Sequence, residues 1–250
     1  MPAQHTTVGI IIVGDELLGG KRQDRHMPHV IDRLHPLGMR VAWVYMIGDE
    51  RQALARFLRR SFTNKETVFC FGGIGATPDD ITRQAAADAL NVSLIRHPEA
   101  VREIEKQFGE TAYPHRILMA ELPPQAGTIP NEYNGIPAFF VDHHYFLPGF
   151  PELAWPMLEW VIEHRLPQCN SRESDTSLIV SDIGESVLLP ILETMTERYP
   201  EVIFSSLPQL QPLRIELGLR SRNPEALSRA EQDLHDTLHQ EGITIFVQNT

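Results

Sequence analysis

Three short segments in the first part of the chain combine carboxylates with glycines, the residue types that bind divalent cations and phosphate groups. Each segment directly follows an apolar stretch. The residues of interest are Gly14, Asp15, Glu16 and Asp24 in the first segment, Asp49 in the second, and Gly72, Gly73, Gly75, Thr77, Asp79 and Asp80 in the third. Backbone N–H groups of a glycine-rich turn that opens a helix bind phosphate, because glycine lets the phosphate approach closely. The third segment therefore predicts a phosphate-binding loop.

The carboxylates in these segments favour a divalent cation beside the phosphate. Near a protein surface, the repulsion between two close like charges is on the order of several kcal/mol. A cation between the carboxylates and the phosphate removes that repulsion, and Mg²⁺ is typically bound by one or two carboxylates together with phosphate oxygens. The third segment matches neither a Walker A motif nor the G-x-G-x-x-G dinucleotide fingerprint.

The segment Thr77-Pro78-Asp79-Asp80 also has a purely structural interpretation. Thr77 could cap a helix, Pro78 would then occupy its first position, and Asp80 would reach back in a capping box. Acidic residues in a first turn also stabilise the helix dipole. Spacing alone supports capping and metal binding equally for Asp80. The occurrence of three such segments, rather than one, favours ligand binding.

The order of apolar segments predicts a sheet that brings these loops together. Strands are expected at 8–13, 41–47 and 67–71, and they alternate with helices, the third of which runs from about Pro78 to Leu90. Such alternation indicates right-handed βαβ units and a parallel sheet. Ligands bind outside the carboxyl ends of the strands in an open parallel sheet, so the three loops should meet at one edge.

The remaining sequence predicts the end of this domain and a second, smaller one. Strands at 138–141 and 145–147 flank a hairpin turn that contains His143-His144, a helix runs from about Pro151 to Arg165, and the polar segment 167–175 is a candidate linker. Beyond it, the element order βαββαβ is that of a ferredoxin-like sandwich. We therefore expect an α/β fold, with a three-layer α/β/α domain and a mostly parallel sheet over residues 1–168, and a small α+β domain over 176–250.

Composition and charge exclude several classes of protein. The formal net charge is −11, and so acidic a chain is poorly suited to tracking a phosphate backbone; nucleic acid is not expected as a partner. No run approaches the roughly 18 to 20 apolar residues that span a membrane. The first seven residues lack the features of a signal peptide, and the cysteines, Cys70 and Cys169, form no metal or redox motif. These features predict a cytoplasmic protein without membrane association.

Taken together, the motifs resemble the N-terminal domain of the competence/damage-inducible CinA family, which has the MoaB/Mog-like molybdopterin-binding fold. The matching residues are Gly14-Asp15-Glu16-Leu17-Leu18-x-Gly20, Asp24, Gly48-Asp49, Gly72-Gly73-x-Gly75-x-Thr77-x-Asp79-Asp80-x-Thr82, Asn131, Gly135-x-Pro137 and Leu147-Pro148-Gly149. Ile183-Gly184-Glu185-Ser186 is similar to the start of the family's KH-like module. No segment matches the C-terminal deamidase domain of long CinA proteins, so deamidation of nicotinamide nucleotides is not expected.

The resemblance implies a ligand, a cofactor and roles for individual residues. It implies binding of a phosphorylated pterin or a nucleotide diphosphate, and for CinA-type domains a metal-dependent hydrolysis of ADP-ribose. Carried over by position, it assigns catalysis to Asp49 and Asp80, Mg²⁺ or another divalent cation to Asp79 and Asp80, and ligand binding to Gly149 beside the residues named above. It also implies a homo-oligomer.

The chain departs from the family pattern near the expected site. Asp24-Arg25-His26 stands where the family has Asp-Thr-Asn, Ala76 replaces a proline, and Ile136 and Ala138 replace a threonine and a glycine. Two hypotheses therefore stand: a Mg²⁺-dependent hydrolase of ADP-ribose, or a module that binds molybdopterin or a related phosphorylated ligand without turnover. A third, nucleic-acid binding by the small domain, is disfavoured by the net charge and by the lack of an evident basic, glycine-rich loop.

Other polar groups have simpler explanations beside their functional ones. His26, His29 and Asp32 recur every three residues and could bind a metal ion on one helix face, although such spacing is ordinary on a solvated face. The basic cluster Lys21, Arg22 and Arg25 either binds phosphate or lies in solvent.

Overall fold

The computed structural model describes residues 7–166, 174–210 and 213–246. The chain divides into two compact units, Met1–Gln168 and Cys169–Thr250. Cys169 lies outside the described residues. None of the helices in the described ranges is long and apolar enough to cross a membrane.

The first unit is built on a six-stranded sheet in the order β2-β1-β3-β8-β7-β6. Strands β2, β1, β3 and β8 are parallel, whereas β7 and β6 add to the sheet antiparallel. Their bounds are β1 Thr7–Val13, β2 Arg40–Ile47, β3 Thr67–Phe71, β6 Gly127–Ile129, β7 Ala138–Val141 and β8 His144–Leu147. A separate pair joins β4 (Ile95–Arg96) to β5 (Glu121–Leu122). The mostly parallel sheet confirms the expected α/β fold class.

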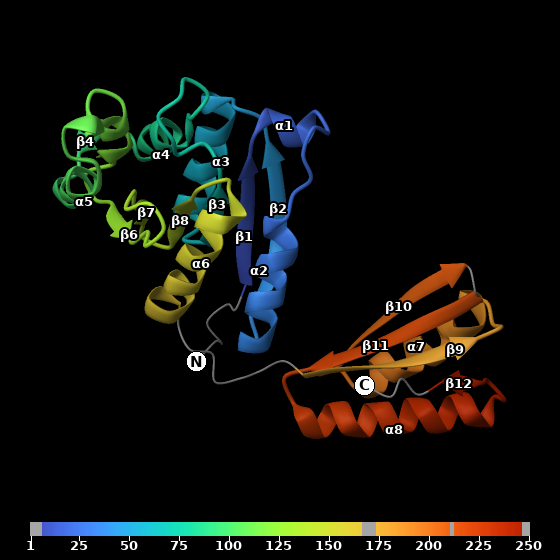
Figure 1. The fold of residues 1–250 in the computed structure, drawn as a ribbon. Helices are drawn as coiled ribbons and strands as arrows, with labels where there is room; N and C mark the ends of the chain where they lie inside the picture. Colours follow the sequence, from blue (N-terminus) through green and yellow to red (C-terminus); the bar gives the residue numbers. More distant parts are fainter. Residues whose placement is uncertain (1–6, 167–173, 211–212, 247–250) are drawn as a thin grey trace. The chain divides into compact units, whose positions relative to one another are not determined.

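Helices cover both faces of this sheet and make three layers (Figure 1). Helices α2 (His26–Leu34) and α6 (Pro151–Arg165) lie across one face, and α3 (Arg51–Thr63) and α4 (Thr82–Leu90) across the other. The remaining helical segments are α1 Asp15–Leu18, α5 Pro98–Phe108, η1 His35–Leu37, η2 Gly109–Ala112 and η3 Arg116–Ala120. Gly38 ends η1 in the left-handed conformation with φ of 70°, which glycine adopts without strain.

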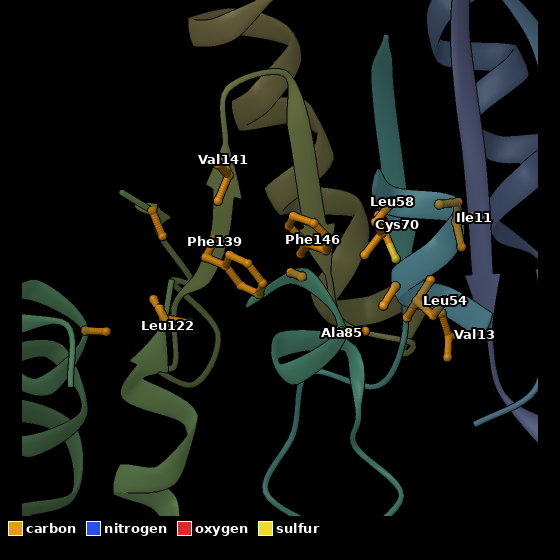
Figure 2. Packing of buried hydrophobic residues seen from close by; sticks show 14 of the residues in the cluster. Ile11, Val13, Leu54, Leu58, Cys70, Ala85, Leu122, Phe139, Val141 and Phe146 are labelled. Carbon is orange, nitrogen blue, oxygen red and sulfur yellow. The ribbon is translucent and has the colours of Figure 1, made fainter. Parts of the chain in front are cut away.

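The core explains why β1 is apolar along its whole length. Side chains alternate between the faces of a strand, so Ile11 and Val13 point toward α3 and share a core cluster with Leu54 and Leu58 of that helix and Cys70 of β3 (Figure 2). Ile10 and Ile12 are equally buried on the opposite face. Burial on both faces is typical of a central parallel strand.

The predicted start of the third helix is wrong. Helix α4 begins at Thr82 rather than Pro78, and residues 78–79 form a turn. The reason is that Thr82 is held by the preceding loop: its backbone N–H donates to the Gly73 carbonyl at 2.9 Å and its hydroxyl donates to the Gly72 carbonyl at 2.8 Å.

The second unit has the predicted order of elements. These are β9 Ser174–Ser181, α7 Glu185–Arg198, β10 Ile203–Leu210, β11 Leu213–Ser221, α8 Pro224–Gln240 and β12 Ile245–Phe246. The antiparallel sheet has the order β10-β11-β9-β12, and its buried residues pack with those of α7 and α8 in one core. This is the ferredoxin-like arrangement. The linker expected to reach Asp175 is shorter, because Ser174 already pairs with Ser221; residues 167–173 lie outside the described residues.

Candidate functional site

The loops that follow the four parallel strands meet at one edge of the sheet. The Gly14 N–H after β1 donates to the Ile47 carbonyl at the end of β2, at 2.9 Å. The Gly72 N–H after β3 donates to the Leu147 carbonyl at the end of β8, also at 2.9 Å. The backbone of Gly149 closely approaches Gly72, since a Cβ built on Gly149 would lie 3.4 Å from the Gly72 Cα. Parallel pairing thus gathers segments that are far apart in the sequence.

A cavity of about 510 Å³ opens at this edge. Nine of the predicted site residues line it, namely Glu16, Asp49, Gly72, Gly73, Gly75, Thr77, Asp79, Asp80 and Gly149. Gly14, Asp15 and Asp24 are not part of its lining. A cavity of this size suits a ligand with several ring systems or phosphate groups.

The glycines of the third loop are required by its conformation. Gly72 and Gly73 have φ angles of 99° and 67°, which side chains other than hydrogen strongly disfavour. A Cβ on Gly72 would also lie 2.4 Å from the Val13 carbonyl oxygen, and one on Gly73 would lie 2.5 Å from the Thr82 hydroxyl oxygen. The loop therefore presents its bare backbone to the cavity.

Asp80 ties the far end of this loop into a turn. Its Oδ2 accepts a hydrogen bond from the Thr77 backbone N–H at 2.8 Å and another from the Thr77 hydroxyl at 2.5 Å. A Cβ on Gly75 would lie 2.4 Å from the same oxygen. The predicted backward reach of Asp80 toward Thr77 is thus present, but it closes a turn that precedes the helix instead of capping the helix itself.

Asp49 lies among other carboxylates. Asp15 and Asp49 exchange hydrogen bonds between backbone N–H and side-chain oxygen, at 3.2 and 3.3 Å. Burial raises the pKa of Asp49. The hydrogen bond from the Asp15 backbone lowers it, whereas the charges of Asp15, Glu16 and Asp79 raise it. A carboxylate in such an environment accepts a proton or a cation more readily than an isolated one.

Asp24 and Gly14 support the site from outside the cavity. Asp24 accepts hydrogen bonds from the backbone N–H groups of His26 and Met27 at 2.9 and 3.0 Å, so it satisfies the first turn of α2. It lines a neighbouring cavity of about 550 Å³, which shares Val13, Glu16, Arg22, Gly149 and Phe150 with the first. Gly14 has a φ of 155°, and a Cβ on it would lie 2.5 Å from a Glu16 carboxylate oxygen.

The side chains at the site fit a metal ion only in part. Among the residues that the structure describes, no three His, Cys, Asp or Glu side chains are grouped so as to hold a metal ion. His26 instead stacks on Phe71 with ring centroids 4.3 Å apart, and His29 stacks on Trp155 at 4.0 Å. The carboxylates of Asp49, Asp79 and Asp80 on the cavity wall can supply one or two oxygens to a cation that also binds phosphate oxygens.

Several cavity residues were not predicted as site residues. They are Val13, Arg22, Ile74, Ala76, Met119, Asn131, Asn134, Ile136, Pro137, Pro148, Phe150, Leu153 and Met157. The motif that carries the family resemblance already contains Asn131, Pro137 and Pro148, so it offered a signal for them. Arg22, named as one of a basic cluster that could bind phosphate, does line the cavity, and its guanidinium lies 5.8 Å from the centre of the Phe150 ring.

Comparison with known proteins identifies the first unit. A family model described as a probable molybdopterin binding domain matches residues 9–168. A CinA-like protein of Koribacter versatilis is 30% identical over 228 residues, which cover 85% of this chain and 54% of the relative. A CinA-like protein of Anaeromyxobacter dehalogenans is 35% identical over 165 residues, 63% of this chain and 40% of the relative. The chain thus spans about half the length, or less, of these relatives.

A solved structure agrees with the fold. The CinA protein of unknown function from Thermoplasma acidophilum matches with a TM-score of 0.58 at 24% identity, over 64% of this chain and 97% of that chain. The family model covers more than half of the chain and includes β2, β3, β8, all but the first two residues of β1, and the cavity loops. The chain therefore belongs to the family of probable molybdopterin-binding domains, and the resemblance to CinA-type proteins that its motifs predicted is confirmed.

Proposed function

We propose that the cavity at the carboxyl edge of the sheet binds a phosphorylated pterin or a nucleotide diphosphate, with a phosphate group on the 72–76 loop. One observation carries this proposal. The backbone N–H groups of residues 73–76 find no acceptor among the described residues, although they belong to a loop that lines the cavity. Unpaired N–H groups in a glycine-rich turn are a binding site for an anion.

The rest of the cavity suits the remainder of such a ligand. Met119, Ile136, Phe150 and Met157 provide apolar contacts, whereas Asn131 and Asn134 provide amides. A mostly apolar lining with a few polar groups is typical of pockets that bind small molecules. Arg22 provides a cation at the rim that could pair with a second phosphate.

We further propose that the ligand binds together with Mg²⁺ or another divalent cation. One or two of the carboxylates of Asp49, Asp79 and Asp80 would hold the cation together with the phosphate oxygens, and Asp80 would use the oxygen that Thr77 does not engage. The cation would neutralise the negative charge that the phosphates share with these carboxylates. Burial is the largest cause of the raised pKa of Asp49, and the charges of Asp15, Glu16 and Asp79 add to it; a bound cation would offset these charges, which supports the proposal.

A second candidate function is hydrolysis of the diphosphate bond of ADP-ribose. Asp49 could accept a proton from a water molecule as its oxygen attacks phosphorus and the phosphorus–oxygen bond of the diphosphate breaks, giving AMP and ribose 5-phosphate. The raised pKa favours Asp49 in this role over a fully solvated carboxylate. Asp80 would keep the glycine loop in place during the reaction.

Two assays separate binding from turnover. A thermal-shift screen of pyrophosphate, AMP, ADP-ribose and a phosphorylated pterin, with and without Mg²⁺, should show a higher melting temperature with at least one ligand, because a ligand that binds only the native state stabilises it. Absence of a shift with all of them would contradict the proposed binding. ADP-ribose incubated with Mg²⁺ and the protein should give AMP faster than with the Asp80→Ala variant. If the wild-type protein forms no AMP above the rate of the variant, the protein is a binding module without detectable turnover that depends on Asp80.

A further inference from the structure

Arg83 places a positive charge inside the protein directly behind the glycine loop. Its residue in α4 is only 3% exposed. One terminal nitrogen, Nη2, donates to the Gly75 carbonyl at 2.7 Å. The other, Nη1, donates to the carbonyls of Leu118 and Glu121 at 2.5 and 3.2 Å. All three acceptors are backbone carbonyls, so no carboxylate hydrogen-bonds to this guanidinium within the described ranges.

A buried cation without a bonded carboxylate is unfavourable unless something else stabilises it. Burial lowers the pKa of Arg83, and the more distant charges of Glu121 and Asp80 oppose that effect. Arginine nevertheless stays protonated in proteins. Its Nε has no hydrogen-bond partner either. The charge is therefore incompletely compensated, and an anion in the adjoining cavity would complete its compensation.

The geometry of one peptide bond connects this charge to the cavity. In a planar trans peptide the carbonyl and the following N–H point in opposite directions. The Gly75 carbonyl points at Arg83, so the Ala76 N–H points away from Arg83. Both Gly75 and Ala76 line the cavity, and the Ala76 N–H has no acceptor among the described residues.

We propose that Arg83 is a positioning residue for anion binding, which holds the Gly75–Ala76 peptide with its N–H toward the phosphate and stabilises the bound negative charge from behind the loop. The inference rests on the proposed function, because it requires an anion in this cavity. It specifies the ligand as one whose phosphate lies at Ala76. Ala76 can bind the anion in this way because it has a backbone N–H, which a proline at this position would lack.

Three variants test the role of the charge. Arg83→Gln keeps a hydrogen-bond donor but removes the charge, Arg83→Lys keeps the charge with fewer donors, and Arg83→Ala removes both. Calorimetric titration with inorganic pyrophosphate and with ADP-ribose should show binding about tenfold weaker for the glutamine variant, equivalent to about 1.4 kcal/mol. The lysine variant should bind better than the glutamine variant. Melting temperatures measured in parallel show whether each variant is folded.

Chemical rescue distinguishes this role from a purely structural one. Guanidinium added to the Arg83→Ala variant should restore part of the pyrophosphate affinity, whereas urea, a neutral molecule of the same shape, should not. If the Arg83→Ala variant does not fold, the NMR chemical shifts of backbone amides in Arg83→Gln test the same role. At saturating pyrophosphate, the ligand-induced shift of the Ala76 amide should be smaller relative to that of Gly73 than in the wild type. Equal rescue by urea, or equal shifts at Ala76, would overturn the inference.

Binding by the wild-type protein separates a wrong function from a wrong role of Arg83. If the wild-type protein binds neither pyrophosphate nor ADP-ribose, the proposed function is wrong and this inference fails with it. If the wild-type protein binds and the glutamine variant binds equally well, the function stands and the role of Arg83 is wrong.

Discussion

Asp15 and Asp49 are joined by a reciprocal pair of hydrogen bonds, in which each backbone N–H donates to the other's carboxylate, at 3.2 and 3.3 Å. The pair fastens the loop after β1 to the loop after β2. It also keeps two negative charges close together beside the cavity. Burial is the main cause of the raised pKa of Asp49; the hydrogen bond from the Asp15 backbone lowers that pKa, and the Asp15 charge raises it.

The raised pKa predicts that Asp49 lowers stability at neutral pH. A carboxyl group whose pKa is higher in the folded protein than its ordinary 3.8 stabilises the fold in its protonated form, and this contribution is lost as the pH rises through the folded pKa. Asp49→Asn should therefore melt at the same temperature as the wild type or higher at pH 7, while it weakens Mg²⁺-dependent ligand binding. Calorimetric scans and titrations measure both effects.

Glu163→Gln is the matched control, because it removes one carboxylate from an exposed position away from the cavity. This control should alter neither ligand binding nor, by more than about 0.5 kcal/mol, stability. A clear fall in the melting temperature of Asp49→Asn, with normal ligand binding, would show that Asp49 serves the fold and not the site.

Asp80 can be tested for its two roles separately. Asp80→Asn retains an oxygen that can accept the Thr77 hydrogen bonds, so it should lose little stability; Asp80→Ala loses both bonds and should be destabilised by about 1 to 2 kcal/mol. If the charge of Asp80 also serves a cation, the asparagine variant should bind the ligand normally without Mg²⁺ and gain less from Mg²⁺ than the wild type. Identical Mg²⁺ dependence would assign Asp80 to the turn alone.

Gly75 tests the fit between the loop and Asp80. An added Cβ would lie 2.4 Å from the Asp80 carboxylate, so Gly75→Ala should displace that side chain and cost about 1 to 2 kcal/mol of stability together with ligand affinity. Gly184→Ala is the control, because its Cβ would meet only the Ser186 hydroxyl oxygen at 3.7 Å. Urea unfolding of both variants gives the comparison; equal stabilities would mean that the loop tolerates the added methyl group.

The sequence was sufficient to predict the sheet edge but not the details of its loops. The strands were recognisable because β1 and β3 are continuously apolar, and parallel pairing then required their following loops to share an edge. The start of α4 was misplaced because Thr77-Pro78-Asp79-Asp80 has the local pattern of a helix start. Thr82 instead donates hydrogen bonds to the carbonyls of Gly72 and Gly73, which lie nine and ten residues earlier in the chain. Such contacts within a loop do not show in the spacing of apolar residues in the sequence.

The site shows the same division between local and long-range information. Residues on the loops after β1, β2 and β3 were predicted, since each follows a strand directly. Met119 and Arg83 do not directly follow a strand. Met119 lies in the short 3₁₀ helix η3, and Arg83 lies in α4, whose other buried residues are threonine and alanine. Their contribution depends on packing between α4 and the 116–122 segment.

The buried His144 predicts a loss of stability in acid. It belongs to β8 and not to the expected hairpin turn, its Nε2 lies 2.8 Å from the Ser61 hydroxyl oxygen, and burial lowers its pKa from 6.5 to about 3. A histidine with a lowered folded pKa stabilises the protein above pH 6.5, and that contribution is lost as the pH falls toward 3. The melting temperature should therefore fall over this range.

A variant isolates the contribution of His144. His144→Gln with Ser61 retained should be less stable at pH 7, since it loses the stacking on Phe62, but its melting temperature should change less between pH 6.5 and 4. The exposed His164→Gln is the control, which should follow the wild type. An unchanged pH dependence in His144→Gln would contradict the assignment.

Calorimetric titration of ADP-ribose with Mg²⁺ into the wild-type protein and into Gly73→Val tests whether the glycine loop binds the ligand. The valine would meet the Thr82 hydroxyl at a position with φ of 67°, so it disrupts the loop without touching the carboxylates. We expect one binding site per chain in the wild type and its loss in the variant, provided that circular dichroism shows the variant to be folded. Equal binding by both proteins would show that the ligand binds away from the glycine loop, which would contradict the proposed site.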